Sequence, residues 1–249
     1  MSNTDHFSTF AAAYAKSRPS YPSELFSWLA GQCGQNKLAW DCGTGNGQAA
    51  HELAIHFDMV HATDLSPQQI AQTTPNPRVH FLCAPAQVSG LENESCDLVT
   101  VAQALHWFCD HQFYSEVDRV LKPGGVIAAW TYTLLDAEPS INRVIKQFHD
   151  HTVGPWWPPE RKWVDLNYVG MPFPFEEFPA PLFIMAREWT LEHLLDYVNT
   201  WSAVQRYRSQ TGRDAMLALR KQLESVWGNP NMVKTIRWPL AIRCGKKKL

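Results

Sequence analysis

Short apolar runs alternate with helix-length amphipathic segments through the first half of the chain. Five of these runs have the length and composition of buried strands, and they cover residues 37–41, 59–63, 79–82, 97–102 and 126–133. Between the last two, Phe113, Val117 and Val120 recur at helical spacing until a Pro-Gly-Gly turn at 123–125 ends the helix. Strands that alternate with helices predict a parallel sheet covered on both faces.

Further elements are expected on either side of this region. Apolar positions at helical intervals predict helices at residues 7–16, 23–30, 191–198 and 216–227. Apolar runs predict two more strands, at 182–187 and 234–242. Together these elements predict an α/β fold with a Rossmann-like, doubly wound sheet of seven strands, mostly parallel, with an antiparallel last strand.

The charge balance and the absence of long apolar runs exclude several classes of protein. The 249 residues include 22 Lys and Arg and 24 Asp and Glu, and the net charge of −2 offers no basic excess for binding nucleic acid. No run approaches the roughly 18 apolar residues of a membrane span, and the first residues hold no apolar signal segment. We therefore expect a cytoplasmic protein without nucleic-acid or membrane partners. The sequence leaves its oligomeric state open.

The cysteines and histidines do not form a recognisable metal site. The six cysteines include no C-x-x-C pair, which favours free, mostly buried thiols. His51 and His56 are five residues apart on a predicted helix, so they point about 140° apart, and His61 lies on a strand. We predict no metal site.

A glycine-rich segment, residues 41–47 with the pattern D-x-G-x-G-x-G, lies where the first predicted strand ends and a helix begins. Glycines at such a turn let backbone N–H groups approach a ligand at the positive end of the helix. A nicotinamide dinucleotide site would place its third glycine at position 48, which is Gln48, and the G-K-[ST] ending of a P-loop is absent. The pattern disfavours both of those ligands.

The second predicted strand ends in Asp64, which follows Gly43 by 64 − 43 = 21 residues. A carboxylate at the tip of that strand can accept hydrogen bonds from both hydroxyls of a ribose. Each such charge-assisted bond contributes about 1.5 to 3 kcal/mol. The glycine loop and Asp64 together indicate an adenosine-type ligand.

Four sequence blocks occur in register: WDCGTGNG at 40–47, ATDLS at 62–66, CDLVTVAQALHWF at 96–108 and RVLKPGG at 119–125. Together they resemble the class I S-adenosylmethionine-dependent methyltransferases, and the resemblance covers about residues 7–134. It implies a single methyltransferase domain over residues 1–249, with S-adenosylmethionine as cofactor and S-adenosylhomocysteine as product.

Within that domain, the resemblance and the sequence pattern predict four parts. They are an N-terminal helical cover (1–36), a cofactor-binding half (37–134), a lid or insert (154–181) and a C-terminal half on the substrate side (182–249). The insert holds seven prolines and seven aromatic residues in 28 positions, so it is too rich in proline for a regular helix and too aromatic for a linker.

The resemblance also implies roles for residues of the glycine loop. Gly43, Thr44 and Gly45 would contact the methionyl part of the cofactor, and Asp41 would bond or orient its amino group. Gln103, which follows the fourth strand, would contribute through its position and backbone.

The adenosine half of the cofactor is expected beside the second and third strands. Asp64 would hold the ribose, and Leu65 would pack on the adenine. Many relatives carry an acidic residue after the third strand that bonds the adenine amino group. This chain has Ala86 and Gln87 near that position, so the Ala86 backbone or the Gln87 amide would have to take that role.

The N-terminal segment, with Tyr14 and Arg18, resembles a subgroup that includes trans-aconitate methyltransferase-like enzymes of small molecules. That resemblance would place both side chains near the charged methionyl end of the cofactor. It favours a small-molecule acceptor, with a carboxylate that becomes a methyl ester as one candidate.

The second candidate is a hydroxyl, phenol or amine acceptor, for which His106 would be the catalytic base. The alternative is that His106 has a structural role and caps the helix that follows it. Two hypotheses from other classes stay open at this point, an NAD-dependent oxidoreductase and a non-catalytic cofactor-binding protein.

Overall fold

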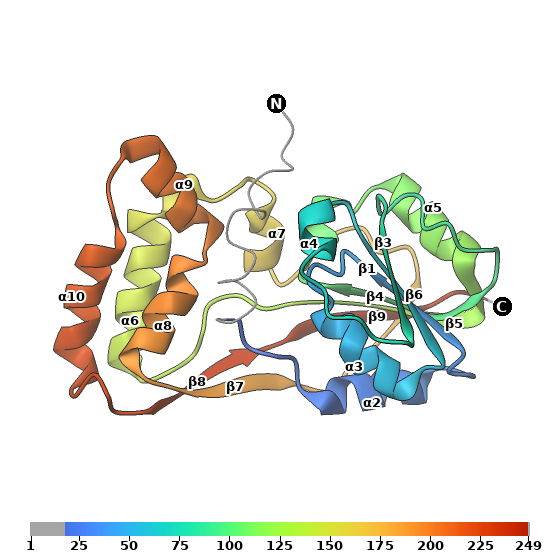
Figure 1. Cartoon of the computed structure of the whole chain (residues 1–249), viewed down its shortest axis with the longest axis horizontal. Helices are drawn as coiled ribbons and strands as arrows, with labels where there is room; N and C mark the ends of the chain where they lie inside the picture. Colours follow the sequence, from blue (N-terminus) through green and yellow to red (C-terminus); the bar gives the residue numbers. More distant parts are fainter. Residues whose placement is uncertain (1–17, 249) are drawn as a thin grey trace.

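The first half of the chain forms most of one central sheet. The structure is a computed structural model, and it describes residues 18–248. Its first elements are α2 (Ser23–Gln32), β1 (Leu38–Cys42), α3 (Gln48–His56), β2 (Met59–Asp64), α4 (Pro67–Ile70), β3 (Val79–Cys83), β4 (Cys96–Ala102), α5 (His111–Val120) and β5 (Leu121–Thr131). Strands β1 to β5 are parallel, and the sheet has the order β3-β2-β1-β4-β5-β9-β6 (Figure 1).

The second half adds a helical layer and a long strand pair. Its elements are α6 (Pro139–Gln147), α7 (Arg161–Asp165), β6 (Glu176–Phe178), β7 (Ile184–Trp189), α8 (Leu191–Asn199), α9 (Ser202–Thr211), α10 (Met216–Trp227), β8 (Lys234–Pro239) and β9 (Ala241–Lys246). Helices α6, α8, α9 and α10 gather at one end of the molecule, away from the seven-stranded sheet. Helix α7 lies between this group of helices and the sheet (Figure 1).

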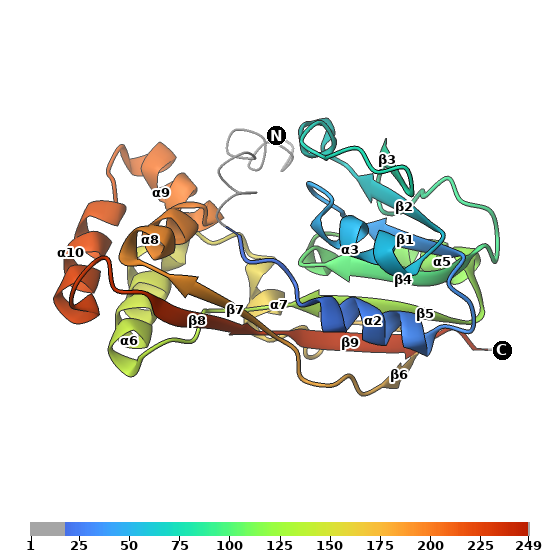
Figure 2. The same cartoon turned by 60° about the horizontal axis from the view of Figure 1, so that its bottom comes forward.

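The seven-stranded Rossmann-like sheet is confirmed, but its last two strands differ from those expected. The strand predicted at 182–187 is β7, which pairs with β8 in a separate two-stranded ribbon. The strand predicted at 234–242 divides at Leu240, so that β8 belongs to the ribbon and β9 enters the sheet antiparallel to β5 (Figure 2). The edge strand next to β9 is β6, which lies inside the proline-rich segment.

The reason for the difference is local. Strand β6 has three residues and no apolar alternation, so its sequence carries no strand signal. Proline residues 179 and 181 separate it from β7 and lack the N–H group that would continue the ladder.

The alternating side chains of the central strands fill two separate cores. Leu98 and Val126 face the side of the sheet that α2 and α3 cover, whereas Val99 and Ile127 face α5 on the other side. Strand residues that are buried on both faces are typical of a parallel sheet between helices. The described residues contain no helix long and apolar enough to cross a membrane.

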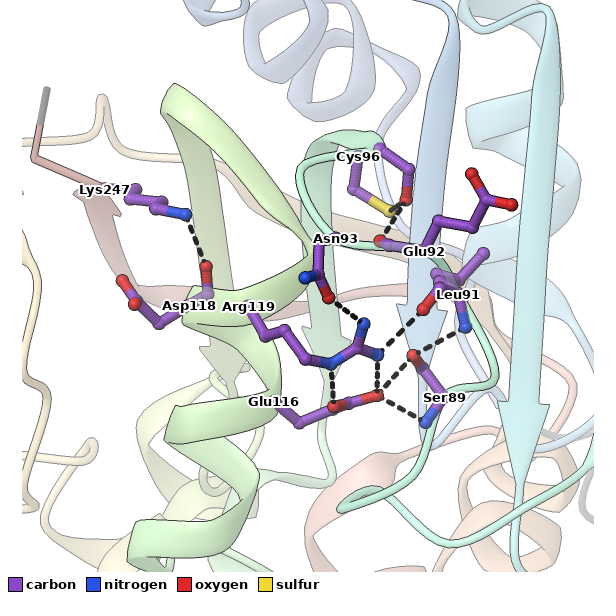
Figure 3. Close-up of polar contacts among 10 residues, drawn as sticks. Ser89, Leu91, Glu92, Asn93, Cys96, Glu116, Asp118, Arg119 and Lys247 are labelled. Carbon is purple, nitrogen blue, oxygen red and sulfur yellow. Dashed lines mark hydrogen bonds and ion pairs between the residues drawn. The ribbon is translucent and has the colours of Figure 1, made fainter.

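Arg119, the first residue of the R-V-L-K-P-G-G block, forms hydrogen bonds with the loop that precedes β4 (Figure 3). Arg119 donates from Nε to Glu116 Oε2 and from Nη2 to Glu116 Oε1, both at 2.8 Å. The same guanidinium donates to the Leu91 carbonyl at 2.8 Å and to Asn93 Oδ1 at 2.7 Å, and the Ser89 N–H donates to Glu116 Oε1 at 2.7 Å. The network therefore holds the 89–93 loop against α5.

Replacing Arg119 with alanine is expected to destabilise the protein by about 2 kcal/mol, because it leaves the Glu116 carboxylate without its charged partner. Burial raises the pKa of Glu116, but the bonds from Arg119 and Ser89 outweigh it and lower the pKa to about 2. The stabilisation is therefore complete above the ordinary pKa of 4.5 and is lost as the pH falls toward 2.

Urea unfolding between pH 2.5 and 7 measures this effect, with Arg143→Ala at an exposed position of α6 as the control. The loss in Arg119→Ala should be largest above pH 4.5 and should shrink in acid. An equal loss at every pH would contradict the assignment to this ion pair.

Candidate functional site

A cavity of about 560 Å³ opens at the carboxyl ends of β1, β2 and β4. This is the point where the strand order reverses, and ligands of open α/β sheets bind there. The volume lies within the usual range of roughly 300 to 1,000 Å³ for small-molecule and cofactor sites. The structure brings together in its lining nine of the residues expected from the sequence: Arg18, Gly43, Thr44, Gly45, Asp64, Leu65, Ala86, Gln87 and Gln103.

The glycine loop forms the floor of this cavity. The N–H groups of Gly43 and Thr44 both donate to the Thr63 carbonyl, at 2.8 and 2.9 Å, which ties the loop to the end of β2. Gly43 has a φ of +70°, and a Cβ built there would lie 2.7 Å from Ala104 Cβ. The loop therefore needs glycine both for its backbone conformation and for its close packing.

Asp41 lies beneath the loop and is fully buried. Its Oδ2 accepts a hydrogen bond from Thr44 Oγ1 at 2.6 Å, and its Oδ1 accepts one from Thr100 Oγ1 at 2.9 Å. Burial raises the pKa of Asp41 to about 6, although these hydroxyl bonds lower it. Because Asp41 does not line the cavity, the geometry favours an orienting role, through Thr44, over a direct bond to a ligand.

Asp64 ends β2 and faces the cavity. Its Oδ2 accepts from the Gly45 N–H and its Oδ1 from the Ser66 N–H, both at 2.8 Å. Burial raises its pKa, and the two backbone bonds lower it. These bonds fix the carboxylate and leave further lone pairs for a ligand diol, since a carboxylate offers about four acceptor positions.

The expected adenine side is formed by Leu65, Ala86 and Gln87. Leu65 is 58% exposed, so it offers an apolar surface at the mouth of the cavity. The Gln87 Nε2 group donates to Asp110 Oδ2 at 2.9 Å, which fixes the amide plane beside the cavity. An adenine bound at this place would need an acceptor for its amino group, and the amide oxygen of Gln87 is chemically suited to that role.

Gln103 turns the chain at the end of β4 with a φ of +56°. Its Nε2 donates to the Tyr132 carbonyl at 3.1 Å, and its Oε1 accepts from the Thr131 hydroxyl. The side chain therefore connects the ends of β4 and β5. A contribution of Gln103 to ligand binding through its position stays a prediction.

His106 lies beside the main cavity, in a smaller one of about 80 Å³. Both cavities are lined by Arg18, Gln103 and Trp107. The His106 Nδ1 atom is 3.2 Å from the Tyr168 hydroxyl. Burial, with a contribution from the charge of Arg161, lowers the pKa of His106 to about 3. Its imidazole is therefore neutral at ordinary pH and accepts a proton poorly.

The remaining expected residue, Tyr14, lies outside the described residues. Sequence reasoning missed several residues that line the cavity: Tyr21, Ser66, Gln69, Trp107, Phe108, Tyr132 and Glu160. Ser66 and Gln69 lie two and five positions after Asp64, so their proximity could have been inferred. Glu160 is in the proline-rich segment, where no periodicity indicates which side chains face the sheet.

Comparisons with known proteins agree with this architecture. Residues 40–129 match the family model described as a methyltransferase domain. A putative methyltransferase of Dictyostelium discoideum is 30% identical over 223 residues, which cover 88% of this chain and 85% of that protein.

Two solved structures have similar folds. A putative type II methyltransferase from Anaeromyxobacter dehalogenans superposes with a TM-score of 0.87 at 40% identity, covering 93% of this chain and 98% of that one. A phosphoethanolamine N-methyltransferase of Haemonchus contortus, in complex with S-adenosyl-L-methionine, has a TM-score of 0.51 at 17% identity, covering 100% of this chain and 60% of that one.

Proposed function

The chain belongs to the class I S-adenosylmethionine-dependent methyltransferases, and we propose that its acceptor is a small carboxylate, which it converts into a methyl ester. S-adenosylmethionine, when bound, supplies a methyl group that the positively charged sulfur has already activated. The protein must place an acceptor oxygen in line with the S–CH₃ bond, about 3 to 3.5 Å from the carbon, and exclude water.

The geometry of the large cavity fits this cofactor. The glycine loop leaves no room for side chains at Gly43, and Asp64 is fixed by two backbone N–H groups beside it. We infer that Asp64 holds the ribose hydroxyls, that Leu65 and Gln87 contact the adenine, and that Gly43 to Gly45 and Arg18 contact the methionyl end.

The observation that carries the carboxylate proposal is Arg161 in the small cavity, because Arg18, which also lines it, is assigned to the methionyl end of the cofactor. Arg161 lines the small cavity together with the hydroxyl residues Thr200 and Ser202. The Arg161 guanidinium is held over the Trp157 ring, 4.4 Å from its centroid, and its Nε is 3.0 Å from Asp165 Oδ1. A preorganised guanidinium is suited to carboxylate recognition.

A carboxylate also suits the weak basicity of this site. Its oxygen forms the new bond to the methyl carbon while the S–C bond breaks, and no proton has to leave. A hydroxyl, phenol or protonated amine would need a base, and His106, with a pKa of about 3, is poorly matched to that task at neutral pH. The resemblance to trans-aconitate methyltransferase-like enzymes supports the same class of acceptor.

Replacing Arg161 with alanine is expected to lower kcat/KM for a carboxylate acceptor about tenfold and to leave the Kd of S-adenosylmethionine unchanged. The reason is that Arg161 lines the small cavity and is not among the described residues that line the large one. Steady-state kinetics and calorimetry on the same preparations measure the two quantities. The control is Arg220→Ala, which removes an exposed arginine that pairs with Glu192 on the outer helices.

His106→Gln separates the two candidate acceptor classes. If His106 were the base, its loss should reduce kcat by roughly 10² to 10⁴. With a carboxylate acceptor we expect a reduction of less than tenfold, from altered packing of the cavity alone.

A protein that binds the cofactor and methylates nothing in a broad acceptor screen would instead be a non-catalytic binder.

A further inference from the structure

Glu160 is an acidic side chain from the proline-rich segment that lines the cofactor cavity. It immediately precedes α7, and its Oε2 atom is buried without a hydrogen-bond partner among residues 18–248. A buried carboxylate oxygen that accepts no hydrogen bond costs about 1 to 3 kcal/mol or more. Such a group is expected to be satisfied by a ligand that enters the cavity.

The position of Glu160 indicates which part of the ligand it meets. Its neighbour in the chain, Arg161, lines the small cavity, which shares the lining residues Arg18, Gln103 and Trp107 with the large one. The adenine side of the large cavity, around Leu65 and Ala86, is formed by the loops after β2 and β3. Glu160 therefore belongs to the end at which methyl transfer takes place.

The charges of the cavity match an α-amino acid. Among the described residues that line it, the charged side chains are Arg18, Asp64 and Glu160. Asp64 is at the ribose position, which leaves one cation and one anion for the methionyl end, where the cofactor carries a carboxylate and an ammonium group. We propose that Glu160 binds the α-ammonium group of the cofactor, opposite Arg18 at its carboxylate.

The sulfonium is a less suitable partner. Its positive charge disappears when the methyl group leaves, so a carboxylate beside it would stabilise the reactant state more than the transition state and slow the reaction. The ammonium group keeps its charge in substrate and product. A contact there adds affinity without raising the barrier. This inference rests on the cofactor and not on the identity of the acceptor.

Calorimetric titration of wild type and Glu160→Gln with three ligands tests the assignment. S-adenosylmethionine and S-adenosylhomocysteine both carry the ammonium group, whereas 5′-methylthioadenosine has the same nucleoside and sulfur but no amino acid. We expect the first two to bind Glu160→Gln about tenfold more weakly, and 5′-methylthioadenosine to change by less than twofold. Glu224→Gln, at an exposed position of α10, is the matched control.

Three results would overturn the proposal. Unchanged binding of all three ligands would show that Glu160 makes no contact with the cofactor. An equal loss for all three would show a structural role, and a loss for S-adenosylmethionine alone would place the carboxylate at the sulfonium. Thermal unfolding of the ligand-free proteins completes the test, because removing an unsatisfied buried charge should not lower Tm. If Glu160→Gln fails to fold, Glu160→Ala is titrated with the same ligands.

Discussion

Asp64→Ala should bind S-adenosylmethionine about a hundredfold more weakly than wild type. The carboxylate is fixed by the Gly45 and Ser66 N–H groups, and we infer that it accepts hydrogen bonds from the two ribose hydroxyls. The loss of two charge-assisted bonds of about 1.5 kcal/mol each corresponds to this change, since about 1.4 kcal/mol of binding free energy changes Kd tenfold. Calorimetry with S-adenosylmethionine and S-adenosylhomocysteine should give the same ratio for both ligands.

The control separates the ribose contact from damage to the loop. Asp58→Ala removes an exposed aspartate that pairs with Lys37 and should leave the affinity unchanged. An analogue of S-adenosylhomocysteine without the ribose hydroxyls should bind wild type and Asp64→Ala with similar affinity. If Asp64→Ala weakened the binding of the analogue as much as that of the natural ligand, Asp64 would contribute only by holding the loop through the Gly45 and Ser66 N–H groups.

Gly43→Ala is expected to lower the free energy of unfolding by about 3 kcal/mol and to abolish measurable cofactor binding. A left-handed backbone costs a non-glycine residue about 1 to 2 kcal/mol, and overpacking adds about 1 to 3 kcal/mol. The new Cβ would lie 2.7 Å from Ala104 Cβ, so either the loop or the end of β4 must move. Urea unfolding and calorimetry measure the two effects.

Gly212 is the matched control, because it has a φ of +67° but nothing within 4 Å of a built Cβ. Gly212→Ala should therefore lose only about 1 kcal/mol of stability, from its backbone conformation, and should keep cofactor binding. Equal losses in the two variants would mean that the close approach of Gly43 to Ala104 has no energetic consequence.

The cofactor half of the fold could be predicted because its signals are local. Each buried strand of the parallel sheet is an apolar run, and the loop and Asp64 lie directly at the ends of two such runs. The topology of α/β sheets then brings these strand ends together. For this reason the sequence indicated five residues of the cavity lining that follow β1 and β2: Gly43, Thr44, Gly45, Asp64 and Leu65.

The methionyl and acceptor side of the site could not be predicted in the same way, because its contacts join distant parts of the chain. Arg18 donates to the Tyr132 hydroxyl at 3.0 Å, a contact between residues 114 positions apart. Glu160 and Arg161 reach the two cavities from a segment without periodicity. The pairing of β7 with β8 likewise depends on the break at Leu240, which separates β8 from β9. The sequence of residues 234–242, which is predicted as one strand, does not indicate this break.

Burial also changed the interpretation of two residues. Asp41 and His106 stand in the motifs as polar residues near strand ends, and a sequence does not reveal whether such residues face the ligand. The structure places Asp41 beneath the loop, bonded to Thr44 and Thr100, and His106 against Tyr168. Their pKa values of about 6 and about 3 follow mainly from burial.

The most direct test of the account is the fate of a labelled methyl group. The protein is incubated with S-adenosylmethionine labelled in its methyl carbon and with a panel of small carboxylic acids, amines and phenols. The products are then treated with mild alkali, which hydrolyses methyl esters to methanol and leaves N-methyl and aryl ether products intact. We predict label that alkali releases as volatile methanol, from a carboxylic acid acceptor. Label that stays in an alkali-stable amine or phenol product would contradict the carboxylate assignment.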